Sequence, residues 1–354
     1  MALASRADGR LAIGGQRHVQ FWDRVDRVEG VPGVTITSPH GGRTVSALAF
    51  APDGRLASGG VDGSICVWTQ QAALAEVIPQ AHNGYGVRWL AWSPSGALVS
   101  AGGHYIYDPP QVALWRPGRR HRLPLHQWDF PAISVAFCPS AVDGRFFAGS
   151  SIDSFFAGSS TGDLAILLVG EQTPAVQVTD AHPRRGVTGG VNAVACAPSG
   201  RLASAGTDGS VALWEQAADG SLRAVNRMDR AHGGRSVRSL VFAADGLLAS
   251  GGSEGTIALW TPAGALLGCF DAHGGMSVRS LVFTASELLS RGQDGTLLSW
   301  KGFPGHDSLG PLPAAAAMAA AAVWRDSSSG DVDRSAAKIA AEYAVDGAAV
   351  GAAV

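Results

Sequence analysis

Alternating apolar and polar positions recur along most of this chain in short segments that are separated by turns. A representative segment, SVRSLVF at residues 236–242, is followed by the turn ADG, the phrase LLASGG, an acidic-glycine turn and a second alternating run that ends in tryptophan. Alternation with a period of two predicts β-strands, and Gly- and Asp-rich turns between them predict antiparallel hairpins. The pattern therefore predicts an all-β chain built from short strands.

The same phrase returns at a nearly constant interval. Its clearest copies are RLASGGVDGSICVW (55–68), RLASAGTDGSVALW (201–214) and LLASGGSEGTIALW (247–260). Six copies end in tryptophan, at intervals of 46, 47, 99, 46 and 40 residues: Trp22, Trp68, Trp115, Trp214, Trp260 and Trp300. The double interval predicts a seventh copy without tryptophan, and GSSTGDLAILL at 158–168 fits, with Leu168 at the tryptophan position. Four strands per ~40–45 residues is the arrangement of a propeller blade.

With these seven copies, the chain resembles the WD40-repeat β-propellers over roughly residues 2–302. The resemblance implies a seven-bladed, all-β propeller over residues 1–302, with negligible helix before Phe303. We name the strands of each blade a to d in chain order. The N-terminus offers no extra outer strand, so blade 7 takes its d strand from residues after Lys301 or stays open; a truncated N-terminus is the alternative.

The composition changes at Phe303. Prolines at 304, 311 and 313 form a linker, and an Ala-dominated segment runs to Val354. We expect residues 303–354 to be a Pro/Ala-rich, low-complexity tail that is partly helical or disordered. Its two candidate helices, by propensity, are Ala314–Arg325 and Ser335–Val345.

Charge and cysteine usage exclude several classes of function. The formal net charge of −2 argues against direct nucleic-acid binding, which needs a basic surface. The four cysteines have no metal-ligand spacing and are expected to be buried apolar side chains: Cys66, Cys138, Cys196 and Cys269. No phosphate-binding loop, zinc-peptidase motif, secretory signal or membrane span is present. We therefore expect an intracellular protein, cytoplasmic or nuclear, with no metal, cofactor or membrane contact.

Serine, histidine and aspartate recur together, which is the combination that activates a nucleophile in hydrolases. A catalytic triad occurs once per site, whereas these residues recur in successive blades. The resemblance implies instead a structural tetrad in which Trp, Ser, His and Asp form a hydrogen-bonded chain. Its expected members are His40, Ser58, Asp62 and Trp68 in blade 2; His182, Ser204, Asp208 and Trp214 in blade 5; His232, Ser250 and Trp260 in blade 6; and His273, Ser290, Asp294 and Trp300 in blade 7.

The remaining blades depart from the tetrad pattern. Blade 6 has Glu254 in place of aspartate, and in blade 3 Asp108 is displaced by the insertion AGGHYIYDPPQ. Blade 4 keeps His126 but has Gly162 at the aspartate position, and blade 1 has Ile13 at the serine position. Blade 4 also contains FFAGSS twice, at 146–151 and 155–160, which indicates a tandem duplication. Blades 1 and 4 are therefore expected to be the least rigid.

The expected function is that of a non-catalytic protein-interaction scaffold, a monomeric propeller within a multiprotein complex. The alternative is a hydrolase-like propeller enzyme with its active site at the channel mouth. The resemblance places the loops before strand a and the b–c turns on one narrow face, toward which a residue near the start of strand a points. That position predicts the following partner-binding residues: Ser46, Arg88, Asn192, Arg238 and Arg279.

Three arginines around one channel mouth favour an acidic or phosphorylated peptide or protein as the partner, because guanidinium groups bind planar anions in bidentate fashion. Two other interpretations remain open. The arginines could be solvated or paired with carboxylates such as Asp271 and Glu254, and the repeated phrase VRSLVF could reflect duplication alone. The blade 3 insertion, with His104, Tyr105 and Tyr107, is the alternative place for a binding surface.

Overall fold

A computed structural model gives the fold of the chain. It describes all residues except 1, 7, 23–31, 83, 94, 103–110, 117–118, 125–131, 139–153, 160, 169–173, 184–189, 218–219, 285–286, 301–319 and 326–354. The described residues form strands and turns, without helices. The strands associate into seven four-stranded antiparallel sheets, and each sheet uses four consecutive strands. These sheets are the blades of a propeller, so the predicted fold class is confirmed.

Each position within a blade is filled by one set of strands. The a strands are β1 (Ala2–Ser5), β5 (Val45–Phe50), β9 (Val87–Trp92), β13 (Ala132–Cys138), β17 (Val191–Cys196), β21 (Val237–Phe242) and β25 (Val278–Phe283). The b strands are β2 (Leu11–Gly14), β6 (Leu56–Gly60), β10 (Leu98–Gly102), β14 (Ser154–Ser159), β18 (Leu202–Gly206), β22 (Leu248–Gly252) and β26 (Leu288–Gly292). The c strands are β3 (His18–Trp22), β7 (Ile65–Trp68), β11 (Gln111–Arg116), β15 (Leu164–Leu168), β19 (Val211–Gln216), β23 (Thr256–Trp260) and β27 (Thr296–Trp300). The d strands are β4 (Val34–Thr37), β8 (Leu74–Ile78), β12 (Arg119–Pro124), β16 (Val176–Val178), β20 (Leu222–Met228), β24 (Leu266–Asp271) and β28 (Ala320–Arg325).

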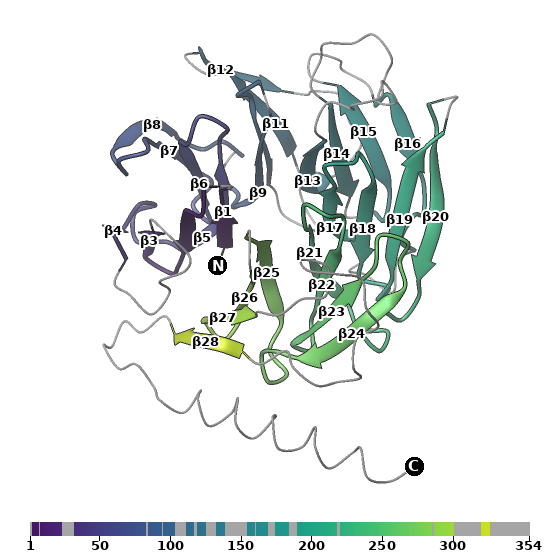
Figure 1. Cartoon of the computed structure of the whole chain (residues 1–354). Coiled ribbons are helices and arrows are strands. Elements are labelled where there is room, and N and C mark those ends of the chain that lie inside the picture. Colours follow the sequence, from purple (N-terminus) through teal and green to yellow (C-terminus); the bar gives the residue numbers. More distant parts are fainter. Residues whose placement is uncertain are drawn as a thin grey trace.

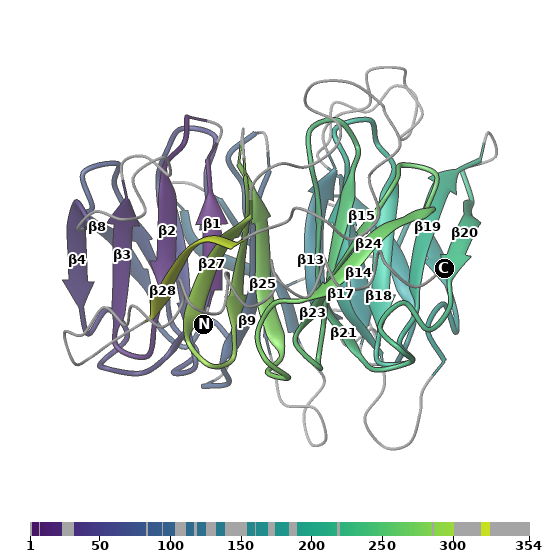
Figure 2. The same ribbon diagram turned by 60° about the horizontal axis from the view of Figure 1, so that its bottom comes forward.

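The a strands surround the axis of the ring, and the d strands lie at its periphery (Figure 1). Each a strand contacts the a strand of the next blade, and β1 contacts β25, which closes the ring. Across this last junction, the Ser5 hydroxyl donates a hydrogen bond of 3.2 Å to the carbonyl of Phe283. The strands of successive blades stand side by side along the axis (Figure 2). Every blade therefore presents its turns at the two ends of the ring.

Neighbouring blades pack through a valine that opens strand a and a small residue in strand b of the preceding blade. Val87 is fully buried, and a Cβ added to Gly59 would lie only 2.5 Å from its Cγ1. The same contact would be 2.6 Å between Gly251 and Val278. In blades 2 and 6 a side chain in place of the glycine would have to displace the next blade, whereas blades 3, 5 and 7 have Ala101, Ala205 and Arg291 at this position. This packing explains the glycine of the recurring phrase LASGG.

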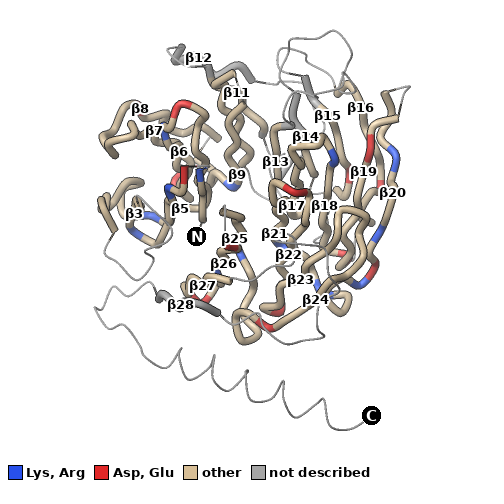
Figure 3. The backbone as a smooth tube through the Cα atoms, in the orientation of Figure 1, with Lys and Arg blue, Asp and Glu red and all other residues tan. Residues whose placement is uncertain are grey.

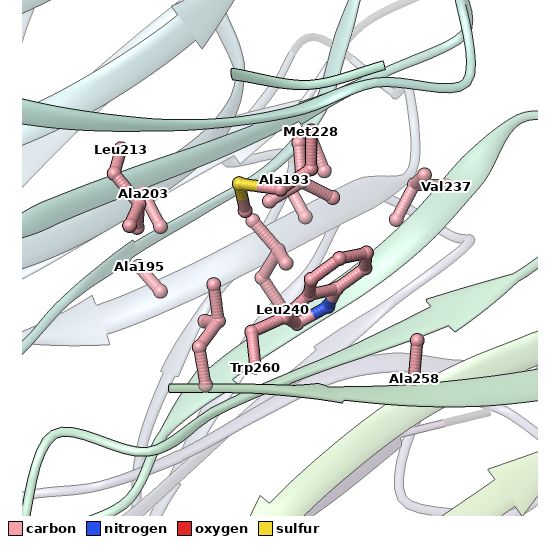
Figure 4. Close-up of a cluster of buried hydrophobic side chains, with 12 residues drawn as sticks. Ala193, Ala195, Ala203, Leu213, Met228, Val237, Leu240, Ala258 and Trp260 are labelled. Carbon is pink, nitrogen blue, oxygen red and sulfur yellow. The ribbon is translucent and has the colours of Figure 1, made fainter. Parts of the chain in front are cut away.

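Apolar clusters fill the space between adjacent blades. One cluster joins blades 5 and 6 and includes Leu213, Met228, Val237 and Trp260 (Figure 4). The cores therefore lie between the sheets, so that each blade depends on its neighbours for burial of its apolar faces.

Strand β28 completes blade 7 by pairing with β27, in agreement with the prediction that the d strand comes from residues after Lys301. Residues 320–325 were expected to belong to a helix, and that expectation is wrong for this segment. The unpaired edge of β27 offers a ladder of backbone groups that outweighs the helix propensity of alanine. The other predictions for residues 303–354 lie outside the described residues and stay predictions.

In blade 4, the strand pairing differs by one residue from the alignment of the repeat that the sequence predicted. In blade 2, Trp68 lies opposite Leu56, and the corresponding pair in blade 4 is Leu167 and Phe155. Leu167, and not Leu168, therefore holds the tryptophan position. The five-residue turn shifts in the same way, so that Thr161 rather than Gly162 corresponds to Asp62. Of the duplicated phrase, the second copy contains β14, while the first copy lies outside the described residues.

Candidate functional site

The five predicted partner-binding residues occupy one structural position. In blade 2, Val45 pairs with Gly60 and Ala47 pairs with Gly59, so Ser46 is a β-bulge residue that the ladder skips. The same shift occurs in β9, β13, β17, β21 and β25. We call the skipped position the bulge slot. Its occupants in blades 2 to 7 are Ser46, Arg88, Ile133, Asn192, Arg238 and Arg279.

The bulge slots lie beside the b–c turns. In blade 2, the N–H of Val61 in this turn donates to the carbonyl of Thr44, two residues before the slot, at 3.0 Å. Blade 6 repeats the bond between Ser253 and Ser236 at 2.9 Å, and blade 7 repeats it between Gln293 and Ser277 at 2.8 Å. The turn and the loop before strand a are thereby fixed to each other at one end of the blade. A bulge next to such a junction re-aims the side chain that it carries.

Two of the six slot residues join neighbouring blades. The Ser46 hydroxyl donates to the carbonyl of Val87, the first residue of the next a strand. The Asn192 amide donates in the same way to the carbonyl of Val237 at 2.8 Å. These hydrogen bonds give Ser46 and Asn192 a role at the blade junction that sequence analysis did not predict.

In blades 4 and 6 the residue after the slot makes this junction bond. Ser134 donates to the carbonyl of Val191, and Ser239 donates to that of Val278, both at 3.3 Å. The slot residue Arg238 is therefore not needed for the junction between blades 6 and 7. The sequence signal for this arrangement is a hydroxyl residue directly after the slot.

The three slot arginines differ in exposure. Arg88 and Arg238 are half-buried, and Arg279 is exposed. Arg279 donates a hydrogen bond of 2.7 Å to the amide oxygen of Gln293 in the b–c turn of its own blade. Other basic positions lie away from the channel, for instance along β20 (Figure 3). The slot arginines thus place three cations at equivalent positions of blades 3, 6 and 7.

The carboxylates proposed as alternative partners for these arginines have other contacts. Glu254 accepts a hydrogen bond of 2.9 Å from Nδ1 of His232 and a further bond from the Thr256 hydroxyl. Asp271 accepts from the backbone N–H of Gly274 at 3.0 Å. These contacts engage both carboxylates within the loops that surround the bulge slots.

The Trp, Ser, His and Asp side chains of blade 5 form a continuous hydrogen-bonded chain. Trp214 Nε1 donates to the Ser204 hydroxyl at 2.8 Å, and that hydroxyl lies 2.7 Å from Nε2 of His182. Nδ1 of His182 lies 3.1 Å from Asp208, which also accepts a bond from Arg227 at 2.6 Å. Ser204 and His182 have no exposed surface. Nδ1 of His182 faces the carboxylate and Nε2 faces the serine hydroxyl, so the ring connects the two groups.

The same network occurs in blades 2, 6 and 7, and in all four blades it includes an additional hydroxyl. In blade 2, Nδ1 of His40 lies 2.7 Å from the Ser64 hydroxyl, which in turn donates to Asp62 at 2.7 Å. The corresponding hydroxyls in the other blades are Ser210, Thr256 and Thr296. Sequence analysis missed this fifth member, although a Ser or Thr follows the acidic-glycine turn in each phrase.

In blades 1, 3 and 4 the hydrogen-bond network differs from the tetrad at positions where the sequence differs. In blade 3, Ser100 bonds Trp115 Nε1 and His82 Nε2, both at 2.9 Å, whereas Asp108 lies outside the described residues. In blade 1, Ile13 occupies the serine position, opposite Gln20. In blade 4 that position is Ala157, and His126 lies outside the described residues.

Burial and hydrogen bonding set the ionisation of these groups. Burial raises the pKa of Asp208, but hydrogen bonds from His182 and Ser210 and the charge of His182 outweigh burial and lower it to about 2. Asp294 has its pKa lowered to about 2 by the same balance. Burial lowers the pKa of His40, although Asp62 opposes the shift. These directions keep the carboxylates charged near neutral pH and favour the neutral imidazole of His40.

The described residues offer few other candidate sites. They contain no group of three or more side chains arranged to hold a metal ion, and no helix that could span a bilayer. A pocket of about 140 Å³ between blades 1 and 2 lies near the a–b and c–d turns, away from the bulge slots, and Phe21, Trp22 and Phe50 line its apolar side. The insertion with His104, Tyr105 and Tyr107 lies outside the described residues.

Comparison with known proteins agrees with the repeat. The family model described as WD domain, G-beta repeat matches residues 33–69, 175–215 and 225–261. Each match begins near or within a d strand and ends within or just after strand c of the next blade, so the sequence repeat links two blades. The solved structure titled "Structure of U3-55K" has a TM-score of 0.57 and 19% identity, and the match covers 71% of this chain and 72% of that chain. At this identity the likeness concerns the fold alone, and 1605 solved chains match this structure.

Proposed function

The chain is a WD40-repeat β-propeller, and from this we propose that it is a non-catalytic scaffold that binds a protein or peptide partner within a multiprotein complex. Strand pairing and blade packing use most of the backbone and apolar surface, which leaves loops and turns free to vary. The proposed contact surface is the end of the ring that carries the bulge slots and the b–c turns.

The observation that carries the proposal is the placement of Arg88, Arg238 and Arg279 at one structural position. Their positive charge at the channel mouth favours an acidic or phosphorylated partner segment. Ser46 and Asn192, which join blades, would complete the surface mainly as polar neighbours. Duplication of VRSLVF does not account for Arg88, because its strand reads VRWLAW.

The hydrolase alternative has no observation in its favour. The serines that would act as nucleophiles are fully buried: Ser58, Ser204, Ser250 and Ser290. Each serine accepts a hydrogen bond from a tryptophan and contacts a histidine, so it is held inside the blade and away from a substrate. A nucleophile must reach the substrate, and these groups satisfy buried polar atoms instead.

We also propose a cytoplasmic or nuclear location. Cys66, Cys196 and Cys269 are free thiols, which is the usual state in a reducing compartment. The expectation of buried cysteines holds for Cys66 but is wrong for Cys269, which is exposed on the outer strand β24, and Cys196 is half-buried. The ring closes through contacts of β1 with β25 of the same chain, so no strand of a second copy is needed to complete it, and we propose that the propeller acts as a single copy within the complex.

Affinity purification followed by binding measurements tests the proposal. The triple variant Arg88→Glu, Arg238→Glu and Arg279→Glu is compared with a control of equal charge change, Arg10→Glu, Arg55→Glu and Arg223→Glu, at the a–b turns and an outer strand. The first variant should bind the purified partner much more weakly than wild type, and its remaining affinity should depend less on salt, because screening acts on the slot charges. Equal affinity of wild type and slot variant across the salt titration would refute the electrostatic part of the proposal.

A further inference from the structure

One a-strand position holds a small residue in six blades and a tryptophan in blade 3. The position directly follows the bulge slot and pairs with strand b. Its small occupants are Ala2, Ala47, Ser134, Ala193, Ser239 and Ser280. In blade 3 the residue paired with Ala101 is Trp89.

The side chain of Trp89 reaches across the axis of the ring. It packs against the cluster between blades 3 and 4, and also against the cluster between blades 5 and 6. Blade 4 separates blade 3 from blade 5 along the ring, so both contacts can be made only across the central channel (Figure 1). The indole therefore occupies the channel near the slot end of β9.

This placement brings an aromatic surface to two blade regions that carry slot arginines. Trp89 follows Arg88 directly, and the cluster that it meets across the axis includes Val237, the residue before Arg238 (Figure 4). The indole is only half-buried, so part of its surface remains accessible.

We propose that Trp89 is the floor of the partner-binding site and determines its specificity for a segment in which an apolar side chain lies next to an anionic one. The inference rests on the proposed function and narrows its ligand class. The anionic group would meet Arg88 or Arg238, while the apolar side chain would cover the indole. Aromatic anchors of this kind provide much of the binding energy at interfaces, whereas charges mainly set selectivity and association rate.

Packing alone does not account for Trp89. The equivalent position accepts Ala or Ser in every other blade, and Ser134 and Ser239 use it to bond the next blade. A tryptophan there removes the possibility of such a bond from blade 3 and places a large apolar surface where a partner can reach it. Accessible aromatic surface beside guanidinium groups suits an amphipathic anionic ligand.

The test uses fluorescein-labelled octapeptides with a Gly/Ser background and the centre Glu-Glu-X-Glu, in which X is Leu, Trp or Ser. A second series replaces Glu by Gln, and a third replaces it by phosphoserine, which distinguishes a carboxylate from a phosphate. Fluorescence anisotropy gives the affinity for wild type, Trp89→Ala and the control Trp92→Phe. Trp92 lies in the same strand, and its Nε1 donates to the carbonyl of Ala49 at 3.1 Å.

Wild type should bind the Leu and Trp peptides about 10-fold more tightly than the Ser peptide, a difference that corresponds to about 1.4 kcal/mol. Trp89→Ala should remove this difference but keep the preference for an anionic series over the Gln series. Trp92→Phe should behave as wild type. A wild type that prefers anionic peptides but binds the Leu and Ser peptides equally overturns the role of Trp89 and leaves the proposed function intact. No preference for either anionic series over the Gln series overturns both.

A second measurement does not depend on the folding of Trp89→Ala. The indole N–H resonance of Trp89 is assigned by its loss in Trp89→Phe. In wild type this resonance should shift when the Leu peptide is added and stay in place with the Ser peptide. If this resonance does not shift with either peptide while anisotropy reports binding, the binding site lies elsewhere.

Discussion

Replacement of Ser204 by alanine tests the interpretation of the Ser, His and Asp groups as a structural network. Ser204 lies in β18 with no exposed surface and connects Trp214 to His182 through bonds of 2.8 and 2.7 Å. Alanine has nearly the same volume without the hydroxyl. The substitution therefore removes both hydrogen bonds and leaves the backbone of the blade unchanged.

The expected loss follows from the two groups left behind. Trp214 Nε1 and His182 Nε2 would both be buried without a partner, and each such group costs about 1–3 kcal/mol. The free energy of unfolding should therefore fall by about 2–6 kcal/mol. In blade 4 the equivalent position is already Ala157, opposite Ala165, and no tryptophan faces it. The cost should thus be specific to blades that contain the full network.

Urea unfolding, followed by tryptophan fluorescence, measures this change. Ser253→Ala is the matched control, because Ser253 lies in a b–c turn and uses its backbone N–H in the bond to Ser236. The control should change the free energy of unfolding by less than about 0.5 kcal/mol. A Ser204→Ala protein as stable as wild type would contradict the structural role. Loss of a hydrolytic turnover without loss of stability would identify Ser204 as a nucleophile.

Three further measurements test the packing, the ionisation and the closure of the ring. Gly59→Ala should lower the free energy of unfolding by about 1–3 kcal/mol, because its Cβ would meet Val87, whereas Gly268→Ala, with open space around its Cβ, should change it little. The pKa of Asp208 is about 2 in the folded protein, against an ordinary value of 3.8. The stabilising contribution of Asp208 is therefore complete above pH 3.8 and is lost as the pH falls toward 2. Asp208→Asn should flatten the pH dependence of the urea midpoint between these two pH values. Truncation after residue 313 should destabilise the protein by removing β28, while truncation after Arg325 should not, as thermal unfolding of both variants can show.

The sequence predicted the blades well because packing between them restricts a few positions strongly. The buried serine and the terminal tryptophan each have one acceptable chemistry, and in blades 2 and 6 a glycine faces the valine of the next blade. Such positions recur in every regular blade and make the repeat visible. Blade 4 lacks the serine and the tryptophan, and there the alignment was shifted by one residue, to Leu168 instead of Leu167.

The bulge and the closing strand were harder to predict. Alternation alone does not reveal an inserted residue, because Val45, Ser46 and Ala47 read as an ordinary alternating strand. Likewise, the alanine-rich composition of residues 320–325 favours a helix locally, and only the free edge of β27 selects a strand. Both features depend on partners that are distant in the sequence.

The bulge slot shows how one position can serve either the ring or a partner. In blades 2 and 5 a short polar side chain at the slot bonds the next blade, through Ser46 and Asn192. In blade 6 the bond moves to Ser239, so the slot residue Arg238 has no part in that junction. The hydroxyl after the slot is therefore explained by blade packing, but the arginine before it is not. Arg279 bonds Gln293 of its own blade, so blade 6 is the clearest case in which the junction does not use the slot arginine, and this supports a role for Arg238 at the surface where the partner is proposed to bind.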